Sequence, residues 1–112
     1  AACPCIRFAN GFYYVLYLEH RTPRWFFETY IARSADLKAW ELSRENPVLS
    51  PQGLDEGINA SDPDLGSDGG YACLFYAVGD QRTWMNIKSA TYPYKPDAFL
   101  NSWFPSPGVS CK

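Results

Sequence analysis

YIARSADLKAWE, residues 30–41, is the stretch from which the fold of this chain is first inferred. Its first residues predict a strand, the polar residues around Asp36 predict a tight turn, and Trp40 begins the next strand. We expect Asp36 to accept hydrogen bonds from backbone amides in that turn. We expect Trp40 to pack on the sheet as a core residue.

The same plan returns further along the chain. Gly11 opens an apolar strand in the first half, and Gly70 opens another roughly 60 residues later, a period typical of repeat architectures. Trp40 ends the first unit and Trp103 ends the second. Two sheet units in series predict an all-β fold that contains two antiparallel β-propeller blades.

The sequence predicts a single partial-propeller domain over residues 1–112, with blades at about 2–50 and 59–104. The expected strands cover residues 2–8, 12–19, 25–34 and 40–44 in the first blade, and 61–65, 71–78 and 84–92 in the second. Residues 52–57 are expected to form a loop, 96–104 a helical turn and 105–112 an irregular tail. The second blade therefore lacks a clear fourth strand.

Composition narrows the class of protein. The chain has 112 residues, of which 46% are apolar, enough for one domain with a core. Aromatic residues reach 17%, which suits pleated, half-buried strands. The net charge of −2 argues against a nucleic-acid partner, because phosphate binding needs a basic face. No apolar run is long enough to predict a membrane-spanning helix.

Two of the expected strands, 12–19 and 71–78, are apolar on both faces. A strand of this kind is normally covered on both sides. Two blades can each cover one face of the other, but their outer faces then stay bare. We therefore expect the chain to be either a piece of a longer propeller or a homo-oligomer.

The four cysteines, Cys3, Cys5, Cys73 and Cys111, allow three disulfide pairings. A bond between Cys3 and Cys5 would be strained, because only one residue separates them. The spacing matches no zinc motif, since the chain has neither a CxxC pair nor a partner His. Buried apolar thiols are the simpler interpretation.

Four segments carry a resemblance to a known superfamily: CPCIRFANGFYYVLYLE (3–19), ARSADLKAWE (32–41), NPVLSP (46–51) and NASDPDLGSDGGYACLFYAVG (59–79). With them the chain resembles the five-bladed propeller glycoside hydrolases, the arabinanase, xylosidase and invertase-like superfamily. The S-x-D-L-x-x-W pattern at a blade end is fairly specific, whereas an Asp-Pro pair alone is weak. Such enzymes hold about 300 residues in five blades, so the chain corresponds to about two of them.

The resemblance implies carboxylates on inner strands around a central channel, acting as nucleophile or base, as general acid, and as modulator of the acid. Asp62 matches the Asp of an inner-strand Asp-Pro motif and is the expected channel carboxylate. Asp64 is expected to help bind substrate, because it shares a face with Asp62 in a regular strand. The alternative is that both residues only cap or turn the strand. Cys5 departs from the pattern, since many relatives have Asp after the inner-strand Pro.

Glu19 and Glu28 are the other candidate catalytic carboxylates. Glu19 ends an apolar strand, and Glu28 lies among aromatic residues. An apolar setting raises a carboxyl pKa, as a general acid requires. The alternative is a strand-end Glu paired with Arg7, Arg24 or Arg33.

Asp80, Arg82 and Trp84 are the remaining candidate substrate-binding residues. Polar groups beside an aromatic ring suit a sugar, but a polar loop of this kind is also a common solvent-exposed cap. His20 is the single His, so a Ser-His-Asp triad lacks support. No motif for a metal, a phosphate group or any other cofactor is present.

The sequence predicts a carbohydrate-active domain related to propeller glycoside hydrolases, with an incomplete catalytic set and carbohydrate as its partner. If active, it would act as a glycoside hydrolase. The alternative is a non-catalytic oligomeric or sugar-binding module that keeps only the blade scaffold.

Overall fold

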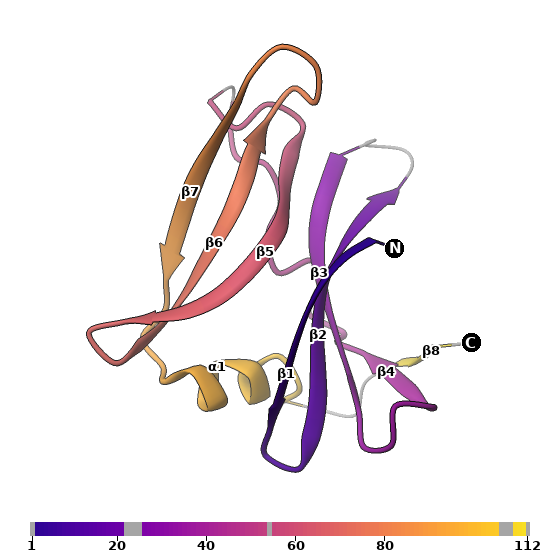
Figure 1. Ribbon diagram of the computed structural model, residues 1–112. Helices are drawn as coiled ribbons and strands as arrows, with labels where there is room; N and C mark the ends of the chain where they lie inside the picture. Colours follow the sequence, from indigo (N-terminus) through magenta and orange to yellow (C-terminus); the bar gives the residue numbers. More distant parts are fainter. Residues whose placement is uncertain (1, 22–25, 54, 106–108, 112) are drawn as a thin grey trace.

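The computed structural model describes residues 2–21, 26–53, 55–105 and 109–111, and within these it contains strands and one short helix (Figure 1). The elements are β1 (Ala2–Ala9), β2 (Phe12–Arg21), β3 (Phe26–Ser34), β4 (Trp40–Leu42), β5 (Asn59–Asp68), β6 (Tyr71–Gly79), β7 (Met85–Thr91), α1 (Pro96–Ser102) and β8 (Val109–Cys111). The predicted all-β class is confirmed, and the predicted strands are found close to their expected bounds.

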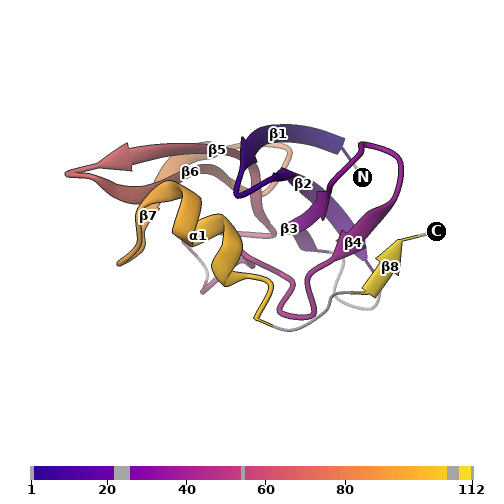
Figure 2. The same ribbon diagram turned by 90° about the horizontal axis from the view of Figure 1, so that it is seen from below.

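The strands form two antiparallel units, which we call the first unit (β1–β4) and the second unit (β5–β7 with α1). In the first unit β1, β2 and β3 are neighbours, and β4 pairs with part of β3. In the second unit β5, β6 and β7 are neighbours. A parallel bridge between Phe27 and Asn59 links β3 to the start of β5. The two units lie side by side, with α1 at one end (Figures 1 and 2).

The two units repeat in register. Each first strand carries one β-bulge at the same distance from its hairpin turn. The pairs that flank the bulge are Ala2–Leu18 and Cys5–Leu16 in the first unit, and Ser61–Ala77 and Asp64–Phe75 in the second. Subtracting 59 from each number of the second set gives the first set. The segment Asp62-Pro63-Asp64 therefore occupies the same place in its unit as Cys3-Pro4-Cys5 does in the first.

The main core lies between the two units. Its buried residues are Cys5, Ala9, Tyr14, Leu16, Ile31, Leu65, Ala72, Leu74, Phe99, Leu100 and Phe104. The first unit contributes one face of β2 and β3, and the second contributes one face of β5 and β6. Phe99 and Leu100 of α1 fill one end of this core, so the helix covers the end of the stack (Figure 2).

The NPVLSP segment lies along the edge of β3. The side-chain amide of Asn46 donates to the carbonyl of Ile31 and accepts from its N–H. Thr29 donates its N–H to the Leu49 carbonyl and accepts from the Val48 N–H. These bonds replace the β4 ladder where that short strand ends, and they carry the chain to the second unit with its backbone groups satisfied.

Some sequence-based expectations need correction. Residues 105–112 were expected to be irregular, but β8 pairs antiparallel with β4. Trp40 is half-buried and does not belong to the core. The helical turn predicted over residues 96–104 is confirmed by α1, and Trp103 lies at the C-terminal end of this helix. Both tryptophans follow the third strand of their unit, but the chain after that strand folds differently in each.

The cysteine prediction is confirmed where the structure describes it. Cys5 and Cys73 are buried free thiols. The side chains of Cys3 and Cys111 lie outside the described part of the chain.

Candidate functional site

The candidate residues from three segments lie at one end of the molecule. The end of β2 with the start of β3, the start of β5, and the loop between β6 and β7 all lie toward the top of Figure 1. The antiparallel topology explains this grouping, because the second strand of each unit ends where the third begins. Folding thus collects residues that are more than 60 positions apart in the sequence.

Asp62 occupies the bulge of β5 in an unusual backbone conformation. Its φ is 55°, in the left-handed region, although it is not glycine and Pro63 follows it. Residues before proline normally adopt extended conformations, and a left-handed non-glycine residue costs about 1–3 kcal/mol. Its side chain is exposed and makes no hydrogen bond or ion pair with the described residues. Asp62 therefore caps no backbone group among the described residues, whereas the alternative that it turns the strand agrees with its place in the bulge.

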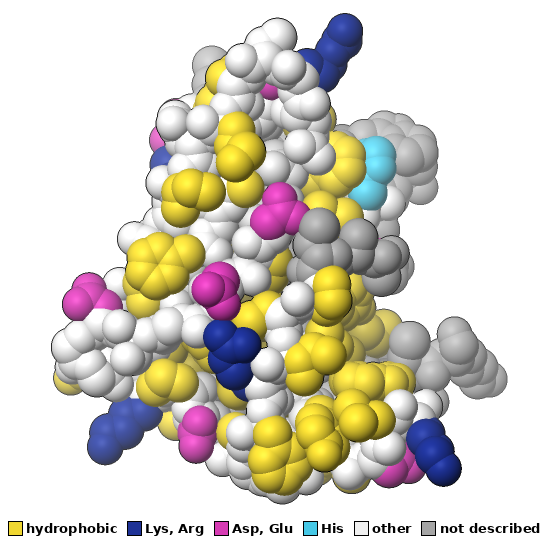
Figure 3. Space-filling model, in the orientation of Figure 1, with side chains coloured by type: hydrophobic (Ala, Val, Ile, Leu, Met, Phe, Trp, Pro, Cys, Tyr) yellow, Lys and Arg dark blue, Asp and Glu magenta, His cyan; other side chains and the backbone are white. Residues whose placement is uncertain are grey.

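Asp64 is exposed and paired. Arg7 of β1 donates from Nη2 to Oδ1 of Asp64 at 3.1 Å and to the carbonyl oxygen of Leu65 at 2.9 Å. The Cys5 thiol lies 3.8 Å from the same carboxylate oxygen. β1 and β5, the first strands of the two units, are therefore joined by side chains here. Figure 3 shows acidic and basic side chains side by side between two hydrophobic regions.

Glu19 and Glu28 are directly opposite partners on β2 and β3. Glu28 is only 1% exposed, and Ser50 donates a 2.7 Å hydrogen bond to its Oε2. Glu19 is half-buried. Burial separates the Glu28 carboxylate from solvent. The catalytic roles of the two residues stay predictions.

The arginines considered as partners for these glutamates mostly bind elsewhere. Arg7 pairs with Asp64, and Arg33 pairs with Glu41 at 2.5 Å. Arg33 also lies between the rings of Phe12 and Phe104, about 4 Å from each. Arg24 lies outside the described residues.

Asp80 organises the loop between β6 and β7. Its Oδ1 accepts from the N–H groups of Arg82, Thr83 and Trp84, and its Oδ2 accepts from the Thr83 hydroxyl. The hydroxyl and these amides hold the pKa of Asp80 well below its usual range. Both carboxylate oxygens of Asp80 are thus bonded within the loop, so its role in the structure is to hold the conformation of this loop.

Arg82 and Trp84 line a shallow pocket of about 340 Å³ beside Asn59, the first residue of β5. Trp84 is 38% exposed and Arg82 is exposed. An open aromatic ring beside a guanidinium group is suited to a polar, ring-shaped ligand. The structure thus places two of the predicted substrate-binding residues at one pocket.

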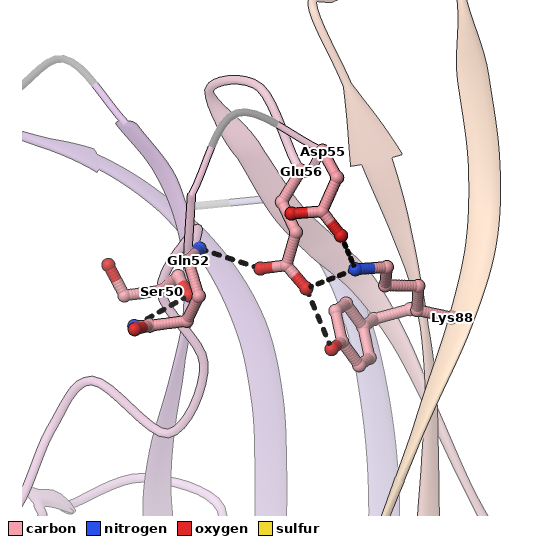
Figure 4. Close-up of polar contacts among 6 residues, drawn as sticks. Ser50, Gln52, Asp55, Glu56 and Lys88 are labelled. Atoms are coloured by element: carbon pink, nitrogen blue, oxygen red, sulfur yellow. Dashed lines mark hydrogen bonds and ion pairs between the residues drawn. The ribbon is translucent and has the colours of Figure 1, made fainter.

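A buried carboxylate that the sequence interpretation missed lies in the loop before β5 (Figure 4). Glu56 is 5% exposed and accepts from the Gln52 N–H at 2.7 Å, from the Tyr76 hydroxyl at 3.3 Å and from Lys88 Nζ at 3.2 Å. Lys88 also binds Asp55, and these two carboxylates raise the pKa of its ammonium group. In the sequence, only the adjacent acidic residues Asp55 and Glu56 could have indicated this cluster, and the segment 52–57 was predicted to be a plain loop.

The Glu56 cluster is a structural link. It ties the 52–57 loop to β6 and β7, and every oxygen of Glu56 has a protein donor. The described residues contain no group of His, Cys, Asp and Glu side chains that could hold a metal ion. In the same part of the chain, no helix is long and apolar enough to cross a membrane.

Comparison of the chain with protein families, curated proteins and solved structures found no match.

Proposed function

We propose that this chain is a carbohydrate-binding domain of the propeller glycoside hydrolase type, with its ligand site centred on Asp62. The observation that supports this most is the strained bulge that holds an exposed carboxylate with no partner in the described chain. Backbone strain of this kind persists only where surrounding structure imposes it, and it concentrates at ligand sites.

The two units are proposed to be two propeller blades. Three features support this: each unit has an inner, a middle and an outer antiparallel strand, the bulges repeat in register, and the faces of the units pack on each other. In this arrangement β1 and β5 line the channel. Asp62, Asp64 and Arg7 then lie on the channel wall, where propeller ligands bind.

The chemistry of these residues suits sugar hydroxyls. The Asp62 carboxylate can accept two or more hydrogen bonds, and bonds to a charged acceptor are stronger than neutral ones. Arg82 supplies donors and Trp84 an apolar surface for the face of a sugar ring. Glycosidic hydrolysis would need a second carboxyl group about 5–9.5 Å from Asp62.

The alternative function is a non-catalytic sugar-binding module, and two observations favour it over an active hydrolase. Cys5 occupies the position equivalent to Asp64, so the first unit presents a thiol where the second presents a carboxylate. Glu28 is buried and bonded to Ser50. A thiol does not replace a carboxylate as a modulator of a general acid.

The test compares two exposed aspartates on β5. Asp62→Asn should leave the fold intact, because Asn adopts left-handed backbone conformations readily. It should weaken binding to oligosaccharides from arabinan or xylan by at least about tenfold. Asp68→Asn, the same change beside the hairpin turn of that strand, is the matched control and should bind like the parent chain.

Two measurements separate the outcomes. Binding to an array of immobilised glycans, followed by titration calorimetry, tests the site. Equal affinity of the Asp62→Asn variant and the parent chain would reject the proposed site. A parent chain that binds no glycan would also reject it. Release of nitrophenol from arabinofuranoside and xyloside nitrophenyl substrates tests hydrolysis. Binding without release identifies the non-catalytic module.

A further inference from the structure

Hydrophobic side chains are exposed in two separate regions, one on each unit (Figure 3). The first outer face belongs to β1 and β2 and consists of Ile6, Phe8, Tyr13, Val15 and Tyr17. The second outer face belongs to β6 and β7 and consists of Phe75, Met85 and Ile87. The largest exposed fractions are 65% for Phe8 and Met85 and 63% for Ile87. Surfaces of this kind mark interaction sites.

The 59-residue repeat relates these faces to the two that pack together inside the chain. Phe75 on the second outer face is equivalent to Leu16, which is buried in the core. Val15 on the first outer face is equivalent to Leu74, which is also buried in the core. Each outer face is thus the repeat counterpart of an inner face on the other unit.

The internal interface shows how such faces are covered. In the core, the Leu16 face of the first unit packs against the Leu74 face of the second. The first outer face is the counterpart of the Leu74 face, and the second outer face is the counterpart of the Leu16 face. Further units packed on these two outer faces would extend the packing of the two units in both directions. The two outer faces are therefore related to each other by the same repeat as the pair that packs inside the chain, whereas neither type of face packs against itself there.

We propose that a second copy of this chain covers these faces, with the first outer face of one copy packed on the second outer face of the next. The contact is head-to-tail, so it builds a closed ring or an open array instead of a self-complementary dimer. A stable contact needs about 1,000 Å² or more of buried surface. This inference does not depend on the sugar site.

The experiment disables one face at a time. Ile87→Asp places a charge on the second outer face, and Phe8→Asp places one on the first. Both positions are exposed, so the monomer fold should survive, which circular dichroism and thermal melting check. Leu37→Asp is the matched control: Leu37 is 50% exposed in the turn between β3 and β4 and is not one of the residues that make up either outer face.

Sedimentation velocity gives the result. The parent chain and the Leu37→Asp variant should exceed the 12.7 kDa monomer mass, and each face variant alone should be monomeric. A one-to-one mixture of the two face variants should form a heterodimer, because each retains the face that the other lacks. A self-complementary interface could not produce this rescue.

Three outcomes would overturn the proposal. One is a parent chain that stays monomeric at concentrations on the order of 100 µM. Another is a face variant that retains the parent's assembly. The last is a mixture of the face variants that stays monomeric although the parent assembles.

Discussion

The first and second units share strand order and bulge position, but equivalent residues have different surroundings. Leu16 is 1% exposed, and its counterpart Phe75 is 45% exposed, although both lie on the middle strand of their unit. The difference arises because the Leu16 face has the other unit against it. The comparison teaches that an apolar residue on a strand becomes core only where a neighbouring unit covers it.

The bulges show the same contrast in polar chemistry. Asp62-Pro63-Asp64 and Cys3-Pro4-Cys5 are equivalent segments, but one carries aspartates and the other cysteines. Pro63 is buried while the aspartates on either side are exposed. The repeated backbone thus supports a candidate site in one unit, whereas in the other the Cys5 thiol is buried in the core.

The largest expected effect comes from truncating a core residue of the first unit, compared with the same truncation of its exposed counterpart in the second unit. Leu16→Ala should lower the free energy of unfolding by about 2–5 kcal/mol, because it leaves a cavity between the units. Phe75→Ala should cost clearly less in the monomer, since Phe75 is already 45% exposed. Urea titration at low protein concentration measures both. Equal losses would show that the faces are not covered as described.

The next effect compares a buried glutamate, Glu56 in the loop before β5, with a more exposed one, Glu41 in β4. The side chain of Glu56 is 6% exposed, and that of Glu41 is 29% exposed. Glu56→Ala should cost about 1–3 kcal/mol, because the Gln52 amide and the Tyr76 hydroxyl lose their acceptor. Glu41→Ala should cost about 1 kcal/mol or less, as for a partly exposed ion pair. Denaturant midpoints of the two variants measure the losses of stability. A larger loss in Glu41→Ala than in Glu56→Ala would contradict the structural role of Glu56.

A smaller effect concerns alkaline pH and the second unit. Burial raises the pKa of Tyr92 to about 12, and its ring packs on Phe99 of α1. The unfolded chain ionises this tyrosine near pH 10, while the folded chain keeps it neutral. Stability should therefore be intact below pH 10 and fall as the pH rises toward about 12.

The matched variants for this effect are Tyr92→Phe and Tyr71→Phe, the latter at an exposed ring in the same unit. Tyr92→Phe should flatten the fall in stability through this range of pH, measured by urea unfolding at several pH values. An unchanged pH profile in Tyr92→Phe, or equal flattening in both variants, would show that Tyr92 does not cause it.

The smallest expected effect compares the turn aspartates. Asp36 accepts from the amides of Ala39 and Lys38, which lower its pKa, and Asp80 is held in the same manner in its loop. Their stabilisation is present above the ordinary carboxyl pKa and is lost as the pH falls through the lowered values. Carboxyl NMR titration should show both ionised well below pH 3.8. Ordinary titration curves would contradict the hydrogen-bonded turns.

Local sequence patterns predicted most of the strands and the turn at Asp36. Gly11 and Gly70 marked the hairpins, and continuous apolar runs marked the strands that follow them, because these signals act over a few neighbouring residues. The amides of Lys38 and Ala39 bind Asp36 as expected, since the turn is closed by residues adjacent in the chain. The choice of Asp62 as the candidate carboxylate came from its Asp-Pro context and stays a prediction.

Long-range packing set the features that the sequence patterns missed. β8 pairs with β4 across more than 60 residues, and Glu56 is buried only because Tyr76 and Lys88 arrive from β6 and β7. The strand pattern treats Leu16 and Phe75 alike, since both are apolar. Leu16 is buried and Phe75 is exposed because burial depends on whether another unit packs against the face that carries the residue. The whole fold determines which faces are packed, and the residues nearby in the sequence do not.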